Sequence, residues 1–290
     1  MPSCLLKIGD GSLLSVDLKR HMHHSSGYIN AGPFRLHYLK MGTGRKLLVA
    51  FHGYGSDASL FLPFEKYLFR NYTIYAFDLP HHGRSQCDTQ PALEKGHMLE
   101  LINDLQKQLH VDKVSLMGYS IGGRVALSIV ELVPGQIERV VLIASDGLVF
   151  NRFYHFLTGV GKGLFKNFLQ KPKIYVSLLD WLKKVRLVDN HRHGFAKHYL
   201  SSESNRSFLL KVWPCLRHLV PDDAGLRRTV QKHSIPVYIY MGQHDKIIPV
   251  RLAQRFKGNL DSVHLYILDK GHRLLDAETV PQIAATLLSD

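Results

Sequence analysis

A short segment in the middle of the chain limits the fold more than any other feature. The residues Val114-Ser115-Leu116-Met117 have the pattern of a buried strand, and a helical pattern covers residues 124–133. Only Gly118-Tyr119-Ser120-Ile121-Gly122-Gly123 lies between the strand and the start of the helix. A strand that passes into a helix through so tight a turn is typical of a βα unit in a parallel sheet. An ordinary glycine-rich turn is the alternative.

Strand and helix patterns alternate along most of the remaining chain. Further strand-like runs cover residues 34–39, 47–51, 73–77, 140–144, 237–241 and 263–268, and helical patterns cover residues 61–69 and 93–109 and follow each of the last two strands. Such alternation predicts an α/β fold with a mostly parallel, doubly wound sheet. We expect residues 27–146 and 233–290 to form this core, preceded by a flexible leader of residues 1–26.

The segment 147–232 lacks strand signals and carries most of the charge. The chain of 290 residues has a net charge of +13, and this segment holds 16 Lys and Arg against 5 Asp and Glu, a net of +11. Its apolar residues form two helical stripes: Phe153, Phe156, Leu157, Val160, Leu164 and Phe168, then Leu178, Leu179, Leu182 and Val185. We expect a helical cap over the carboxyl edge of the sheet, where ligands of α/β proteins bind.

Ser120 is the candidate nucleophile. Glycine at positions 118 and 122 lets the strand and helix backbones pass closely, and the turn holds Ser120 in a strained conformation with its hydroxyl projecting. The N–H of Ile121 then points to where an oxyanion would form. A serine hydroxyl is a weak nucleophile at neutral pH, so it needs a base within hydrogen-bond reach.

Two later loops supply candidates for that base and for the acid behind it. His272 follows the predicted strand 263–268 and a glycine, so we expect it at the carboxyl edge of the sheet as the general base. Asp245 follows the predicted strand 237–241 and would fix the histidine tautomer. Asp146 is a rival acid, and Asp245 could instead be a helix N-cap or turn aspartate. The alternative for His272 is a solvated surface histidine.

The chain order Ser120, Asp245, His272 resembles that of the α/β-hydrolase superfamily. Two stretches add to the resemblance: His52-Gly53-Tyr54-Gly55, and Asp78-Leu79-Pro80-His81-His82-Gly83-Arg84-Ser85. Together these motifs are similar to those of single-domain esterases, C–C bond hydrolases and haloperoxidases that have a helical cap. The resemblance covers about residues 28–146 and residue 234 to the end.

The resemblance implies an oxyanion hole made by the backbone N–H groups of Tyr54 and Ile121, and loop-shaping roles for His52 and Asp78. The chain departs from the family at His81, where glycine is common, so that turn is expected to differ in shape. No residue of the cap can be matched to the family. Because substrate choice depends on the cap, the resemblance does not reach it.

A serine at the turn favours acyl-enzyme chemistry over that of epoxide hydrolases and haloalkane dehalogenases, which use aspartate. The sequence therefore predicts cleavage of a carboxylic ester or thioester through an acyl-enzyme on Ser120. A C–C bond hydrolase, an acyltransferase and a ligand-binding relative without activity are the alternatives. This chemistry needs no metal or organic cofactor. The pairs His81 with His82 and His191 with His193 lack a carboxylate or cysteine at metal-ligand spacing.

The positive charge of the cap has three possible explanations. It could be a solvated face, it could attract an anionic substrate, or it could make transient contact with acidic lipid through Phe153, Phe156, Trp181 and flanking lysines. No nucleic-acid-binding module is present, so charge alone does not favour nucleic acid. No apolar run reaches the length of a membrane-spanning helix. Cys4, Cys87 and Cys215 form neither a disulfide framework nor a CxxC site, so we expect reduced thiols and a cytoplasmic location.

Overall fold

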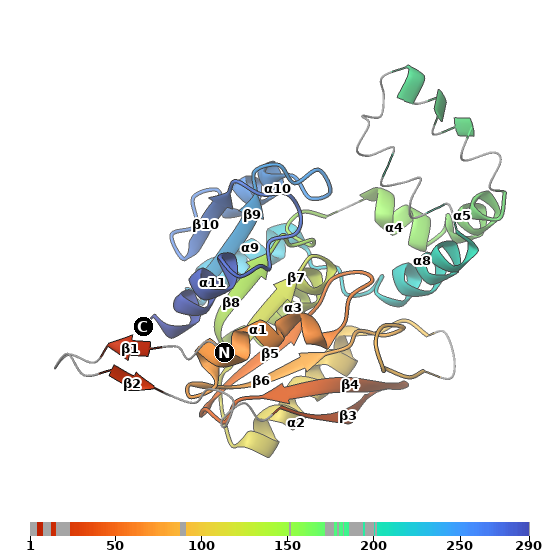
Figure 1. The fold of residues 1–290 in the computed structure, drawn as a ribbon. Helices are drawn as coiled ribbons and strands as arrows, with labels where there is room; N and C mark the ends of the chain where they lie inside the picture. The colour runs from red at the N-terminus through yellow and green to blue at the C-terminus, as the bar shows by residue number, and fades with distance from the viewer. Residues whose placement is uncertain are drawn as a thin grey trace.

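The computed structural model describes residues 5–7, 13–15, 24–87, 91–150, 152–171 and 202–289, with isolated positions between 177 and 200. Its strands are β1 (Leu5–Lys7), β2 (Leu13–Ser15), β3 (Ser25–Ala31), β4 (Phe34–Met41), β5 (Lys46–Phe51), β6 (Tyr72–Phe77), β7 (Val114–Tyr119), β8 (Ile137–Ile143), β9 (Val237–Gly242) and β10 (Val263–Leu268). Its helices are α1 (Leu62–Leu68), α2 (Lys95–Leu109), α3 (Ile121–Leu132), α4 (Arg152–Thr158), α5 (Lys162–Leu169), α8 (Glu203–Cys215), α9 (Asp223–Lys232), α10 (Val250–Lys257) and α11 (Thr279–Leu288) (Figure 1).

Eight of these strands form one sheet in the order β10-β9-β8-β7-β5-β6-β4-β3. Neighbours from β10 to β6 pair in parallel, whereas β4 runs antiparallel to both β6 and β3. The predicted α/β fold with a mostly parallel sheet is confirmed. The strands β1 and β2 pair with each other outside this sheet, within the segment predicted to be a leader. The flexibility of that leader stays a prediction.

Helices cover both faces of the sheet, and β5 shows why its sequence is continuously apolar. Leu47, Val49 and Phe51 belong to a core cluster shared with α2, α3, α9 and α10. Leu48 and Ala50 belong to a second cluster, on the opposite face, shared with α1 and α11. Because successive side chains of a strand point to opposite faces, a strand covered on both sides needs apolar residues at every position.

The outermost strand, β3, was not predicted. Its residues alternate between exposed and partly exposed positions, and only Ala31 at its end is fully buried. Such a polar edge strand lacks the apolar run on which the other predictions depended. Gly27 adds to the difficulty, since glycine is uncommon in strands. Here it leaves room for the ring of Tyr38 on β4, because a Cβ would lie 2.5 Å from the Tyr38 hydroxyl.

Between β8 and β9 the described residues form only helices. Figure 1 shows α4, α5 and α8 gathered beyond the sheet, in the position expected of a cap, whereas α9 lies beside the sheet. Leu226 and Val230 of α9 are buried in the cluster that includes α3. The first predicted apolar stripe was expected to be one helix, but the chain breaks it into α4 and α5 at Gly159-Val160-Gly161. The boundaries of the cap at 147 and 232 stay a prediction.

Candidate active site

Ser120 lies between β7 and α3 with φ 53° and ψ −119°, a left-handed conformation that is costly for any residue except glycine. The neighbouring glycines make this turn sterically feasible. A Cβ on Gly118 would lie 2.4 Å from the Cα of Gly123, and a Cβ on Gly122 would lie 2.0 Å from the carbonyl oxygen of Phe51. The strained backbone at Ser120 and the close approach at both glycines agree with what the sequence predicted for this turn.

The imidazole of His272 lies within hydrogen-bond distance of the Ser120 hydroxyl, although the two residues are 152 positions apart in the sequence. The Nε2 atom of His272 lies 3.1 Å from the Ser120 Oγ, and Nδ1 lies 2.7 Å from Oδ2 of Asp245. A carboxylate can only accept a hydrogen bond, so Nδ1 carries the proton and Nε2 is free to accept one from the serine. The side chain of His272 is 17% exposed and that of Asp245 is 0% exposed.

Asp245 combines two roles that the sequence presented as alternatives. Its Oδ1 accepts hydrogen bonds from the N–H groups of Ile247 and Ile248, at 2.8 and 2.9 Å. This is the behaviour of a turn aspartate. Its Oδ2 is the atom that accepts from His272. Because the turn contacts fix one oxygen, the second is held toward the imidazole without freedom to rotate away.

The loop of His272 is fixed by its backbone as well. The hydroxyl of Tyr119, the last residue of β7, donates to the carbonyl oxygen of His272 at 3.1 Å. The end of β9 lies against the same loop, since a Cβ on Gly242 would be 2.1 Å from the carbonyl oxygen of Gly271. Sequence reasoning missed both contacts. Gly242 at the end of an apolar strand was the one signal available, because such a glycine marks a close backbone approach.

The rival acid, Asp146, has different partners. Its Oδ2 accepts from the guanidinium of Arg124 on α3, and its Oδ1 accepts from the N–H of Gly147 at 2.7 Å. Burial alone would lower the pKa of Arg124, but the attraction of the Asp146 carboxylate outweighs it, so the pKa lies above its ordinary value. The N–H of Asp146 also donates to the carbonyl oxygen of Ser120 at 2.9 Å. Asp146 thus stabilises the serine turn by linking the Ser120 backbone to Arg124 on α3.

The oxyanion hole of Ile121 and Tyr54 stays a prediction, and both residues belong to segments next to Ser120. Ile121 is the first residue of α3, and the first N–H groups of a helix have no partner within it. Tyr54 follows Gly53 in the loop after β5. A Cβ on Gly53 would lie 3.1 Å from the Cβ of Ser120, so glycine keeps this loop close to the serine. The Tyr54 ring packs against Phe208 of α8, with ring centroids 4.9 Å apart.

His52 and Asp78 have the contacts expected of loop-shaping residues. Nε2 of His52 accepts from the N–H of Leu79 at 2.9 Å and Nδ1 lies 2.7 Å from the carbonyl oxygen of Gly53, which fixes a neutral tautomer. Burial lowers the pKa of His52, in keeping with this assignment. The Asp78 carboxylate, also buried, accepts from three groups: the Ala58 N–H at 2.7 Å, the Arg84 N–H at 2.8 Å and His37 Nδ1 at 2.8 Å.

The turn after Asp78 contains His81, and the expected difference of this turn from the family's shape stays a prediction. His81 has φ 64°, in the left-handed region that favours glycine. Its neighbour His82 is buried between His52 and Phe208, with ring centroids 4.9 and 4.8 Å away. Nδ1 of His82 donates to the carbonyl oxygen of Pro80 at 2.9 Å. Burial, followed by repulsion from His52, lowers the pKa of His82 from 6.5 to about 4.

This low pKa predicts a loss of stability in acid. Below pH 6.5 the unfolded chain binds a proton at His82, whereas the folded chain does so only near pH 4, so acid favours unfolding across this interval. His82→Phe removes the proton-binding group, and we expect its unfolding free energy to fall less between neutral pH and pH 4, by about 3 kcal/mol. Urea unfolding followed by circular dichroism measures this difference. The exposed His233→Phe is the control, and an equal fall in wild type and His82→Phe would contradict the prediction.

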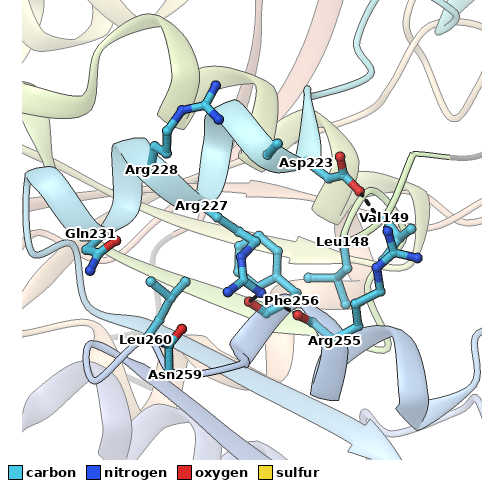
Figure 2. A pocket seen from close by; sticks show the side chains of 11 residues that line it. Leu148, Val149, Asp223, Arg227, Arg228, Gln231, Arg255, Phe256, Asn259 and Leu260 are labelled. Carbon is cyan, nitrogen blue, oxygen red and sulfur yellow. Dashed lines mark hydrogen bonds and ion pairs between the residues drawn. The ribbon is translucent and has the colours of Figure 1, made fainter.

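A cavity of about 370 Å³ lies apart from these residues, between α9 and α10 (Figure 2). Three arginines line it, but two have partners within the protein. Arg227 Nη1 donates to the carbonyl oxygen of Phe256 at 2.7 Å, and the Arg255 guanidinium lies 3.8 Å from the Asp223 carboxylate. The third, Arg228, is exposed. Arg227 and Arg255 therefore link α9 to α10.

Two further observations concern the described residues only. No group of three or more His, Cys, Asp and Glu side chains among them could hold a metal ion. His191 and His193, one of the pairs considered from the sequence, lie outside the described residues. The helices that the structure describes are all too short or too polar to span a membrane.

Comparison with known proteins agrees with the fold. A family model described as alpha/beta hydrolase fold matches residues 46–276. The hydrolase YugF of Bacillus subtilis is 24% identical over 252 residues, which are 85% of this chain and 90% of that protein.

Two solved structures resemble most of the chain. The 2-hydroxy-6-oxo-6-phenylhexa-2,4-dienoate hydrolase of Rhodococcus sp. strain RHA1 has a TM-score of 0.63 at 19% identity and covers 92% of this chain and 100% of its own. A structure from a study of carboxylesterases of the thaumarchaeon Nitrososphaera gargenis has a TM-score of 0.61 at 18% identity, with coverages of 90% and 98%. At these identities the likeness concerns the fold. With its model matched over most of the sequence, the chain belongs to the α/β-hydrolase fold family.

Proposed function

We propose that the protein is a serine hydrolase that cleaves a carboxylic ester or thioester through an acyl-enzyme on Ser120. The observation that carries the proposal is the continuous path of hydrogen bonds from Ser120 through His272 to Asp245. A hydroxyl, an imidazole and a buried carboxylate in this order are the parts that nucleophilic acyl transfer requires. Ester or thioester carbonyls are attacked by serine without a cofactor.

In the first half-reaction the Ser120 Oγ attacks the substrate carbonyl carbon while His272 Nε2 takes the hydroxyl proton. The negative charge on the carbonyl oxygen is stabilised by the N–H groups of Ile121 and Tyr54. Asp245 stabilises the imidazolium that forms. When the carbonyl re-forms, the bond to the leaving alcohol or thiol breaks, and His272 gives its proton to that group.

In the second half-reaction a water molecule attacks the acyl-enzyme, and His272 takes one proton from it. The acyl–oxygen bond to Ser120 then breaks, the serine recovers its proton from His272, and the carboxylic acid leaves. An acyltransferase would use the same residues with another acceptor in place of water. A C–C bond hydrolase is the second candidate, because the Rhodococcus hydrolase of the same fold has a name of that class.

Covalent labelling by a fluorophosphonate tests the proposal. We expect one adduct per folded chain, located on Ser120 by peptide mass mapping, because the reagent captures a serine activated by a neighbouring base. Heat-denatured protein and a His272→Ala variant are the controls and should label far more slowly. A folded wild-type sample that does not label would favour the ligand-binding relative without activity.

The substrate class is then resolved by a panel of p-nitrophenyl esters and thioesters that vary in acyl length and charge. A preference for anionic members that weakens with added salt would support an anionic substrate, because salt screens charge attraction. Turnover of a vinylogous diketone with no turnover of any ester would favour the C–C bond hydrolase.

A further inference from the structure

The turn between α4 and α5 displays three large apolar side chains to solvent. Phe156 is 50% exposed, Val160 is 95% exposed and Leu164 is 71% exposed. We call these three residues the cap tip. The carbonyl oxygen of Phe156 accepts from the N–H groups of Gly159 and Gly161, at 3.2 and 2.9 Å, so the chain turns back on itself between the two helices.

The cap tip is centred on this turn. A Cβ on Gly161 would lie 2.8 Å from the ring of Phe156, so the ring rests against the turn that carries Val160. Leu164 lies in the first turn of α5, four residues after Val160. The three exposed side chains thus lie close along the chain, on the turn and on the two helix ends that flank it.

The opposite sides of α4 and α5 are held firmly by the remainder of the protein. Tyr154 is buried, its hydroxyl donates to the carbonyl oxygen of Trp213 at 2.7 Å, and the guanidinium of Arg124 lies 4.1 Å from the centre of its ring. The ring of Phe165 stacks on Trp213, with centroids 5.8 Å apart and planes 13° apart. The inner apolar residues thus already have partners, whereas the three side chains of the cap tip remain exposed to solvent.

The charge around the cap tip has one sign. From residue 147 to residue 179 the sequence contains five Lys and Arg and no Asp or Glu. Lys162, Lys166 and Lys171 are exposed and, within the part of the chain that the structure describes, form no ion pair. Exposed apolar side chains with flanking lysines and no acidic residue are complementary to a surface that has an apolar interior and a negatively charged outer layer.

We propose that the cap tip docks on the surface of an anionic lipid membrane. Phe156, Val160 and Leu164 enter the boundary between headgroups and acyl chains, while the lysines contact the headgroup phosphates and carboxylates. A second copy of the chain would bury the same apolar residues, but it would bring the lysines of two caps together. The charge therefore favours lipid over self-association.

Vesicle co-sedimentation of the full chain tests this docking. We expect binding to vesicles of phosphatidylcholine mixed with phosphatidylserine, and little binding to phosphatidylcholine alone. The double variant Val160→Gln/Leu164→Gln should bind at least about tenfold more weakly, because two apolar side chains no longer enter the bilayer. Both positions are largely exposed, so the fold should not change. Each of Lys162→Gln and Lys166→Gln should weaken binding about fivefold.

Ile267→Gln is the matched control, because Ile267 is 47% exposed on β10, the strand at the end of the sheet. It should bind vesicles as the wild type does. Equal binding by the double variant and the wild type, or equal binding to both kinds of vesicle, would overturn the proposal. So would a dimer in sedimentation velocity that the double variant abolishes.

Docking and catalysis can be tested separately. Ser120→Ala should bind vesicles like the wild type, and Val160→Gln/Leu164→Gln should hydrolyse a soluble p-nitrophenyl ester like the wild type. Failure of the proposed chemistry would therefore appear as absence of ester hydrolysis with vesicle binding intact. Failure of the docking proposal would appear as hydrolysis with no vesicle binding.

Discussion

Replacing Ser120 with alanine is expected to reduce kcat for p-nitrophenyl acetate by roughly 10⁵-fold. The variant lacks the oxygen that attacks the carbonyl carbon, so His272 has no hydroxyl to deprotonate and the acyl-enzyme cannot form. Thermal unfolding should be unchanged, because the turn depends on its glycines and backbone hydrogen bonds, which alanine keeps. Initial rates at saturating substrate and a melting curve measure the two quantities.

Ser128→Ala is the matched control for this substitution. Ser128 lies on the same helix, α3, and its buried hydroxyl has no hydrogen-bond partner among the described residues. Its removal should leave kcat unaltered. If Ser120→Ala retained most of the wild-type kcat and Ser128→Ala had the same kcat as the wild type, Ser120 would not be the nucleophile.

Replacing Asp245 with asparagine is expected to lower kcat by about 10⁴-fold. The amide keeps the size of the carboxylate and can still accept from the Ile247 and Ile248 N–H groups, but it cannot stabilise a charged imidazolium. An amide N–H directed at His272 would also favour the tautomer with its proton on Nε2, which cannot accept the serine proton. The loss should be in kcat, with KM little changed, because Asp245 is buried away from the substrate.

Asp146→Asn separates the two candidate acids. Its carboxylate pairs with the buried Arg124, so the substitution should lower the unfolding free energy by leaving that cation poorly compensated. Its kcat should fall far less than that of Asp245→Asn. Steady-state kinetics and urea unfolding of both variants decide the matter. A larger loss of kcat in Asp146→Asn would reverse the assignment of the acid.

The sequence was sufficient for the parts of the site that come from local patterns. The strands β7 and β9 are buried and have apolar runs, and β10 has a similar run although it is a partly exposed edge strand, so all three could be located. Each catalytic candidate follows the end of one of them. Parallel strands bring their carboxyl ends to the same edge. This placed Ser120, Asp245 and His272 at one edge, although nothing in the sequence fixed the distances between them.

Contacts between distant segments could not be predicted in the same way. Arg124 reads as an exposed helix cation, yet it is buried against Asp146, because the loop after β8 returns over α3. The stripe from Phe153 to Phe168 has uninterrupted helical spacing, but two glycines flank Val160 and the chain turns there. Periodicity reports which residues can share a face and does not report where a helix ends.

The joint between cap and core has a bearing on how such proteins could be recombined. Asp146, the last residue before the predicted cap, is hydrogen-bonded through its backbone to Ser120 and through its side chain to Arg124 and Gly147. A chimera that receives a foreign cap at a junction before Asp146 would lose the hydrogen bonds from Asp146 to Ser120 and Arg124 together with the original cap. A junction after Gly147 would exchange the predicted cap and leave these contacts of the serine turn intact.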